Sequence, residues 1–238
     1  MVSALFPLTV RGAKASRRGA VLVGPVDLDI GAEGTTVVVG PNGSGKTSLL
    51  ALLHGTNRLT GGEITWSTPM EHARAAQAFV FQRPVMLRRS VIDNIAYPLH
   101  VRGTPRKEAR MQAEDWAERV GLQSMLERPA RSLSGGEQQK LALARAMIGG
   151  PKLLFLDEPC AALDGRATRE IEAILTEVRA AGTKLILSTH DLGQARRLAD
   201  DVIFLLRGKV HEQGAAETFF EGPKTSEAQS FLRGDIVE

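Results

Sequence analysis

The sequence contains few cysteines, few aromatic residues and no long hydrophobic run. Cys160 is the single cysteine among 238 residues. One chain can therefore form neither a disulfide nor a cysteine-based zinc site, and a reducing compartment is its natural setting. No apolar run approaches the roughly 18 residues that a membrane-spanning helix needs. Met1–Arg11 lacks a charged segment ahead of an apolar core, so we expect no signal peptide. If the protein works at a membrane, another molecule must hold it there.

The charge balance is only slightly basic. The formal net charge is +3 and the pI is about 9.2, with both signs interspersed along the chain. An excess this small and this dispersed indicates an ordinary solvated surface, and we expect no nucleic-acid partner. The 43% of hydrophobic residues is enough for one large domain with a real core.

Strand and helix patterns alternate along most of the chain. Thr35–Val39 is a continuous β-branched run, which is typical of a strand buried on both faces. A glycine-rich loop and a helix from about Lys46 to Gly55 follow it, and strand, loop and helix in this order begin a parallel α/β sheet. Further strands are predicted at 26–30, 63–66, 78–81, 153–156, 184–188 and 202–206, and helices at 105–120, 140–148, 166–180 and 192–198.

Two segments depart from this alternation. Strand patterns disappear between about residues 83 and 131, where a charged amphipathic helix pattern indicates a helical insertion. Residues 207–238 predict a turn at Arg207-Gly208 followed by short helical pieces.

The loop after the first buried strand carries a phosphate-binding pattern. Its residues fit G-x-x-x-x-G-K-[ST] in the order Gly40, Pro41, Asn42, Gly43, Ser44, Gly45, Lys46 and Thr47. The glycines let several backbone N–H groups face one phosphate. Lys46 supplies a positive charge for the β- and γ-phosphates, Thr47 offers a hydroxyl to Mg²⁺, and Ser48 can reach the α-phosphate. A chance glycine-rich turn would not combine the strand, the lysine, the hydroxyl and the helix.

Polar residues follow three of the predicted strands. Asp157 and Glu158 end the strand at 153–156, where Asp157 can hold Mg²⁺ through water and Glu158 can polarise a water towards the γ-phosphate. Gln82 can ligate Mg²⁺ or sense the γ-phosphate, and His190 can hydrogen-bond the γ-phosphate and the attacking water. Taken alone, a glutamine, a histidine or an acidic strand end is usually an ordinary surface feature. Beside the phosphate loop, these residues indicate nucleotide hydrolysis.

A second glycine-rich run lies about 90 residues after the loop, just before the helix predicted at 140–148. It reads Leu133, Ser134, Gly135, Gly136 and Glu137. The run offers a serine hydroxyl, free backbone N–H groups and a helix N-terminus, all of which suit an anion. Two anion-binding surfaces in one chain of this size indicate that two chains share each nucleotide.

Together these motifs resemble the ATP-binding cassette ATPases over about residues 8–235. The matching segments are the Walker A loop at 40–47, the glutamine loop at Gln82, the signature at 133–137, the Walker B strand at 153–157, the catalytic base Glu158, the D-loop at 162–164 and the switch histidine His190. The resemblance implies an α/β phosphate-loop NTPase with a mostly parallel core sheet and a small antiparallel β subdomain, both within 1–82 and 132–238, and a helical subdomain at 83–131. All three belong to one domain over 1–238.

The resemblance also implies cofactors and roles. ATP and Mg²⁺ are the expected cofactors; Glu158, His190, Lys46 and Gln82 take the catalytic roles, and Thr47, Gln82 and Asp157 face the metal ion. It implies a head-to-tail dimer with a second copy, in which Ser134, Gly135, Gly136 and Glu137 of one chain complete the site of the other.

Two departures from the family pattern are notable. Glu137 stands where glutamine is commoner, and we expect no loss of activity from it. The aromatic residue that usually stacks on adenine is missing, because the corresponding segment is Ala15-Ser16-Arg17-Arg18. A guanidinium can stack on a base, so we predict that Arg17 or Arg18 takes this role, with weak base selectivity.

The cassette is alone on its chain, which resembles importers built from separate subunits. The segment Pro84–Leu99 resembles the importer region that receives a short helix of the membrane partner, and Val85, Met86 and Leu87 are candidates to line the groove. The expected partners are integral membrane permease subunits and, indirectly, an extracytoplasmic solute-binding protein, with the chain peripheral on the cytoplasmic face of the inner membrane. One alternative is a non-transport cassette ATPase acting on a macromolecular complex; another, a phosphate-loop kinase, has no use for a signature run.

The cargo is not chosen by this chain. Its overall appearance, including Glu137–Lys140 and the tail segments Glu217–Phe220 and Phe231–Gly234, resembles cassettes of oxyanion importers. Tungstate-type subunits are the nearest, followed by phosphate-type and polar-amino-acid-type ones.

Overall fold

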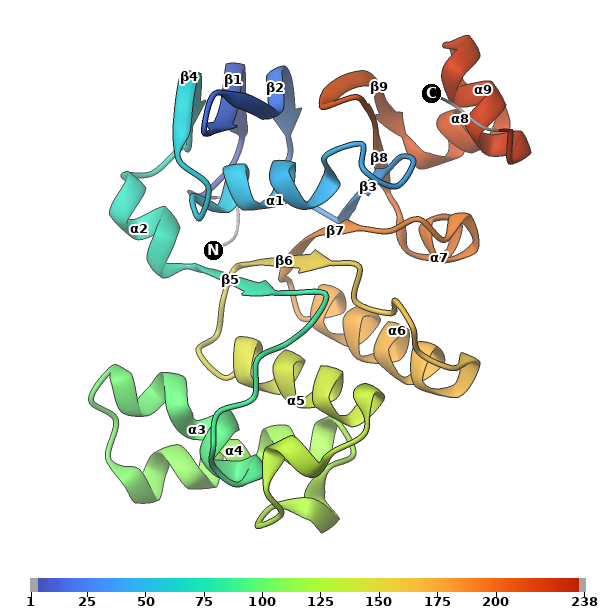
Figure 1. Cartoon of the computed structure of the whole chain (residues 1–238). Helices are drawn as coiled ribbons and strands as arrows, with labels where there is room; N and C mark the ends of the chain where they lie inside the picture. Colours follow the sequence, from blue (N-terminus) through green and yellow to red (C-terminus); the bar gives the residue numbers. More distant parts are fainter. Residues whose placement is uncertain (1–3, 236–238) are drawn as a thin grey trace.

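The computed structural model describes residues 4–235, which form two sheets and nine α-helices (Figure 1). The larger sheet has the strand order β5-β6-β7-β3-β8-β9, and the smaller has the order β2-β1-β4. The strands are β1 (Leu8–Arg17), β2 (Ala20–Ile30), β3 (Thr35–Val39), β4 (Leu59–Thr65), β5 (Gln77–Val80), β6 (Leu153–Asp157), β7 (Lys184–Ser188), β8 (Asp201–Leu206) and β9 (Lys209–Ala215). The helices are α1 (Lys46–His54), α2 (Met70–Ala75), α3 (Val91–Val101), α4 (Arg106–Arg119), α5 (Gly135–Met147), α6 (Gly165–Ala180), α7 (Leu192–Leu198), α8 (Ala216–Glu221) and α9 (Ser226–Arg233).

The central sheet is parallel from β5 to β8, and β9 closes its edge antiparallel to β8. Every residue of β3, β6 and β7 is buried, as expected for strands covered on both faces. Successive side chains of these strands enter different hydrophobic clusters. In β6, Leu154 and Leu156 join one cluster while Leu153 and Phe155 join the other. The period of two in a strand thus divides the core into two layers.

One layer lies between the central sheet and the antiparallel sheet. The helix α1 contributes Leu49, Leu50, Leu52 and Leu53 to it, and β1 and β2 supply most of the opposite wall. Figure 1 shows α1 between β1, β2 and β4 on one side and the central strands on the other. The phosphate loop is therefore held at the start of a helix that is packed on both sides.

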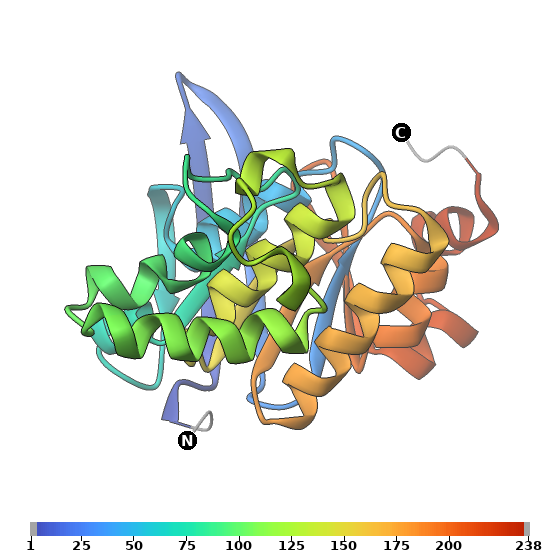
Figure 2. The ribbon, with the colours of Figure 1, turned by 90° about the horizontal axis from the view of Figure 1, so that it is seen from below.

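The second layer lies on the opposite face of the central sheet, under α5 and α6. Figure 2 shows these two helices crossing that face, with α3 and α4 beside α5. Residues of α3, α4 and α5 belong to the same hydrophobic cluster as that face of the sheet. The Ser90 hydroxyl caps α3 by accepting from the Asp93 N–H. The helical segment thus shares the main core.

The fold class predicted from the sequence is confirmed, with local corrections. The short helical pieces predicted within 207–238 are present as α8 and α9, but β9 at Lys209–Ala215 comes before them and was not predicted. The backbone of β9 pairs antiparallel with β8, which the sequence pattern alone did not reveal. The helix predicted from residue 140 begins at Gly135, so the second glycine-rich run forms its first turn. The short helix α2 had no counterpart in the prediction.

No helix within residues 4–235 is long and apolar enough to cross a bilayer.

Phe155 tests the two-layer core. Its ring is fully buried in β6, 6.1 Å from the Phe79 ring and 5.5 Å from the His54 ring. We expect Phe155→Ala to lower the free energy of unfolding by about 3–5 kcal/mol, because it leaves a cavity in a close-packed layer. Urea denaturation followed by circular dichroism measures the change. The control is Met111→Ala on α4, whose side chain is 60% exposed and which should change stability by less than about 0.5 kcal/mol. Equal losses in both variants would contradict the core position of Phe155.

Candidate functional site: a phosphate loop at the edge of the central sheet

The glycine-rich loop leaves β3 and curls tightly before α1 begins. Gly40, Gly43 and Gly45 have φ values of 151°, 80° and 101°, a region that side chains with a Cβ rarely adopt. A Cβ at Gly40 would lie 2.1 Å from the Leu205 carbonyl oxygen. The loop is also held from behind, because the Gly208 N–H donates to the Ser44 carbonyl at 2.8 Å and the Gly24 N–H donates to the Gly208 carbonyl at 2.7 Å. The curled conformation thus depends on glycine and on contacts from both sheets.

Lys46 is the first residue of α1 and its side chain is only 5% exposed. Its ammonium donates to the carbonyl oxygens of Gly40 at 3.0 Å and Pro41 at 3.1 Å, and it lies 3.7 Å from a Glu158 carboxylate oxygen. Burial lowers the pKa of Lys46, and the attraction of Glu158 opposes that shift. The loop therefore wraps around a positive charge and, with the α1 N-terminus, favours an anion.

The loop fits a phosphate group on a further observation. The Ser44 side chain is 4% exposed, and its hydroxyl oxygen has no hydrogen-bond partner among the described residues. A buried hydroxyl without a partner is costly, and a phosphate oxygen would supply one.

Asp157 connects three elements at the end of β6. Its Oδ1 accepts hydrogen bonds from the Thr47 hydroxyl at 3.0 Å and the Ser188 hydroxyl at 2.7 Å. All three groups present oxygen atoms, the ligand type that Mg²⁺ prefers. The described residues hold no group of three or more acidic, histidine or cysteine side chains that could form a metal cage. One carboxylate and one hydroxyl beside a phosphate loop instead fit a Mg²⁺ ion shared with phosphate oxygens.

Glu158 is the point where the polar side chains meet. Its Oε2 accepts from the Gln82 amide at 3.2 Å and lies 3.1 Å from His190 Nδ1. Its backbone has φ 45°, a strained value for a residue with a side chain, and its N–H is held by Ser188. Because β5, β6 and β7 are adjacent and parallel, the three side chains arrive at the same sheet edge.

These residues surround one pocket of about 700 Å³. It is lined by Val21, Leu22, Asn42, Gly43, Gly45, Lys46, Thr47, Ser48, Gln82, Glu158 and His190. The structure thus brings together the loop, the glutamine, the glutamate and the histidine that the sequence predicted.

Three residues of the site were not identified from the sequence. Ser188 ends β7 and orders both acidic residues, but only the pairing of Asp157 with Ser188 across the sheet shows this. Val21 and Leu22 form an apolar part of the pocket wall. No local signal distinguishes these two residues from other strand residues.

Arg17 and Arg18 are not among the lining residues of this pocket. Arg17 ends β1, and Arg18 lies in the turn to β2 with φ 52°. An adenine contact by either arginine stays a prediction.

The second glycine-rich run lies apart from this pocket. Ser134 is the N-cap of α5, and it lines a separate concavity with Gly136 and Glu137 that shares no residue with the loop pocket. A Cβ at Gly136 would lie 3.0 Å from the Ala167 side chain, so this glycine also permits close packing of α5 on α6. Ser134 and Gly135 are exposed and available to another molecule.

Glu137 closes a capping box at the start of α5. Its Oε2 accepts from the Ser134 N–H at 2.7 Å and from the Ser134 hydroxyl at 2.8 Å, while its own N–H approaches that hydroxyl at 3.4 Å. These hydrogen bonds from the Ser134 backbone and side chain hold the pKa of Glu137 below its ordinary value. Glutamate at this position is therefore a cap that orients the serine.

The chain is similar to known proteins over nearly all of its length. A family model described as "ABC transporter" matches residues 23–161. The tungstate uptake system ATP-binding protein TupC of Peptoclostridium acidaminophilum is 35% identical over 90% of this chain and 99% of its own. The phosphate import ATP-binding protein PstB 2 of Natronomonas pharaonis is 35% identical over 97% of this chain and 87% of its own. Other relatives are named for the import of sulfate and the transport of arginine or glutamate.

A solved structure has the same fold. It is an ATP-binding cassette in a dimeric post-hydrolysis state bound to ADP and Pi, with a TM-score of 0.77 and 24% identity, covering 88% of this chain and 98% of that chain.

The capping box gives a pH-dependent prediction. Because the folded pKa of Glu137 is lowered, its stabilisation is present above the unfolded value of 4.5 and is lost as the pH falls through the folded pKa. We expect Glu137→Ala to lower the free energy of unfolding by about 1 kcal/mol near pH 7, with the deficit shrinking below about pH 4.5. Urea denaturation across this pH range measures it.

Glu137→Gln is the matched control, because it keeps the capping geometry without a titrating group. It should lose less stability than the alanine variant near pH 7. A deficit of the alanine variant that does not change with pH would contradict a role for the Glu137 charge.

Proposed function

Because the chain belongs to the ABC transporter family and is one of its ATPases, we propose that it powers the import of a small solute through a separate membrane permease. The observation that carries this proposal is the convergence of Gln82, His190 and Lys46 on the Glu158 carboxylate, beside a glycine-rich phosphate loop. Such an arrangement serves the hydrolysis of a phosphate anhydride and has no use in passive binding.

Each residue of the site has a distinct part in the proposed reaction. The loop N–H groups and Lys46 hold the β- and γ-phosphates in place. Glu158 accepts a proton from the attacking water, while His190 and Gln82 orient that water and the γ-phosphate. Thr47 and Asp157 would hold Mg²⁺, which neutralises charge on the phosphates when bound.

Ser134 points to a second copy of the chain as a partner. The exposed signature run lies outside the loop pocket of its own chain, so a partner's nucleotide is the anion it can reach in a head-to-tail dimer. Support comes from the dimer with ADP and Pi described for a protein of the same fold.

The membrane partner would contact the segment that follows Gln82. Val85 is 72% exposed and suits such a contact, whereas Met86 is 5% exposed and packs in the main core. Leu87 is half-buried. The proposed setting is the cytoplasmic face of the membrane, with an extracytoplasmic solute-binding protein delivering the cargo to the permease.

Tungstate or another oxyanion is the proposed cargo, with phosphate and polar amino acids next. The proposal follows the similarity to the tungstate uptake and phosphate import proteins. No residue of the loop pocket would touch the cargo, because that pocket is taken by the nucleotide.

Glu158→Gln tests the proposed base. The amide keeps the shape and the hydrogen bond with Gln82 but cannot accept the proton, so the hydrolysis rate should fall by about 10²–10⁴-fold. ATP affinity should stay within a few-fold, and gel filtration with ATP should show a persistent dimer. Glu114→Gln, on the exposed side of α4, is the control and should hydrolyse ATP at the original rate. Near-normal hydrolysis by Glu158→Gln would refute the role of Glu158.

The cargo is tested with the reconstituted transporter. We expect the ATPase rate of the complex to rise several-fold when the cognate binding protein carries tungstate, because loaded binding protein favours the closed, hydrolysing state. The same binding protein offered arginine should give no rise. A response to arginine alone would overturn the oxyanion assignment, and a rate that ignores the permease altogether would count against import.

A further inference from the structure

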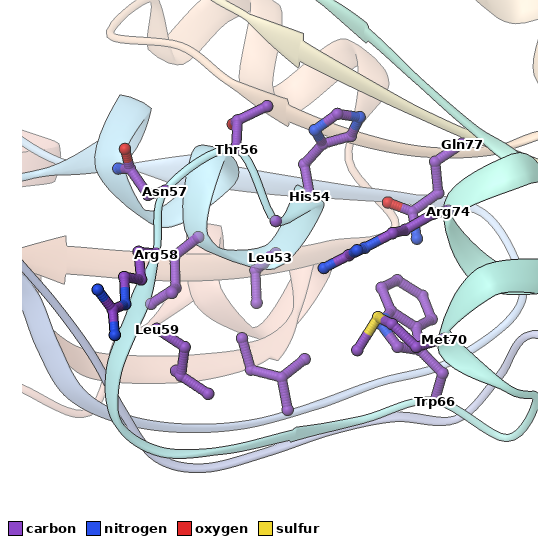
Figure 3. A pocket seen from close by; sticks show the side chains of 13 residues that line it. Leu53, His54, Thr56, Asn57, Arg58, Leu59, Trp66, Met70, Arg74 and Gln77 are labelled. Atoms are coloured by element: carbon purple, nitrogen blue, oxygen red, sulfur yellow. The ribbon is translucent and has the colours of Figure 1, made fainter.

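A second pocket lies at the opposite end of α1 from the phosphate loop. It has a volume of about 460 Å³ and is enclosed by the last turn of α1, the loop to β4, β4, α2 and the start of β5 (Figure 3). It shares no residue with the nucleotide pocket. Its volume lies in the range of sites for small organic molecules, about 300–1,000 Å³.

One wall of this pocket is apolar. It includes Leu53, Ile64, Trp66 and Met70. Trp66 is 7% exposed and is held in place by an edge contact with Phe6, whose ring centre lies 5.9 Å away. Trp66 thus gives the wall a firmly packed ring, and the wall offers a surface for a hydrocarbon body.

The other wall carries polar groups without partners. Arg74 extends its guanidinium from α2 across the pocket towards Leu53 (Figure 3). Its side chain has no hydrogen bond or ion pair with any residue in 4–235. Gln77 is only 9% exposed, and its Oε1 is buried without a hydrogen-bond partner among the described residues. A buried amide oxygen that accepts nothing costs free energy, so this position favours a ligand with a donor.

The charge of the pocket is positive. Among the described residues, its lining holds Arg58 and Arg74 but no aspartate or glutamate. His54 adds no charge near neutral pH, because burial, and then the nearby Arg74, lower its pKa. A ligand with a carboxylate is therefore attracted, and an ammonium group would find no counter-charge there.

We propose that this pocket binds a small carboxylic acid with an apolar chain and a hydroxyl close to the carboxylate, such as a 2-hydroxy acid. The carboxylate pairs with the Arg74 guanidinium, a match of two planar groups. The hydroxyl donates to Gln77 Oε1, and the apolar chain lies against Leu53, Trp66 and Met70. This inference does not rest on the proposed function, since it involves neither nucleotide nor permease.

Isothermal titration calorimetry of the whole chain without nucleotide tests the proposal. The probes are 2-hydroxy-4-methylpentanoate and 3-phenyllactate, near pH 7. We expect at least one of them to bind, and Arg74→Ala to weaken that binding by about tenfold or more, because a charge-assisted pair is lost. Gln77→Leu should weaken it less, through loss of a neutral hydrogen bond. Arg106→Ala is the matched control, since Arg106 is an exposed arginine on α4 outside the pocket and its removal should leave binding unchanged.

Three analogues separate the groups of the ligand. Each analogue should bind more weakly than 2-hydroxy-4-methylpentanoate. 4-Methylpentanoate lacks the hydroxyl, and 2-hydroxy-4-methylpentanamide lacks the negative charge. Leucine carries an ammonium group in place of the hydroxyl. Thermal unfolding of Arg74→Ala should match the unmodified protein, because the side chain is exposed.

Clear outcomes overturn the proposal. It is wrong if neither hydroxy acid binds at up to about 10 mM. It is also wrong if Arg74→Ala binds them as well as the unmodified chain does, or if leucine or the amide binds as tightly as 2-hydroxy-4-methylpentanoate.

Discussion

The in-register pairing of β6 with its neighbours β5 and β7 is the constraint on which the site depends. Parallel hydrogen bonds place Val80 beside Leu156 and Asp157 beside Ser188. The strands therefore end together, and the residues that follow them reach one carboxylate, that of Glu158. A slip of one residue would turn the side chains of β6 to the wrong face and separate Asp157 from Thr47. The strand register that buries the core thus also brings the residues of the site together.

The polar residues at the end of the central sheet cost folding free energy, and burial of the two hydrophobic layers offsets that cost. Lys46 is buried with its charge, Glu158 has a strained backbone, and the loop needs glycine where a Cβ would collide with Leu205. Fully buried leucines of α1 and the strands, each worth about 1.5–3 kcal/mol relative to exposure, surround these features. Strain of this kind at a sheet edge is sustained only where the surrounding packing over-determines the conformation.

Much of the fold and of the site could be predicted because their signals are local. The buried strand, the loop pattern and the helix from Lys46 follow one another within about 20 residues, and the acidic pair is visible as the end of an apolar run. The order of strands in the sheet is not local, so Ser188 gave no sign of its contact with Asp157. Strand β9 was missed because its exposed, polar alternation resembles a loop, and only pairing with β8 makes it a strand. The adenine contact by Arg17 or Arg18 stays a prediction, and so do the bounds 83–131 of the helical subdomain.

The hydrogen bonds behind the phosphate loop give the loop a mechanical property. Ser44 is tied to Gly208 in the turn between β8 and β9, and Gly208 is tied to Gly24 in β2. The loop that would hold a phosphate is therefore connected by hydrogen bonds to both sheets at once. Within residues 4–235, no hydrogen bond joins α3 or α4 to the loop. These helices contact α5 by packing and through the Arg145 hydrogen bond to Asn94. The phosphate loop is thus braced by hydrogen bonds from both sheets, whereas α3 and α4 join the core through α5.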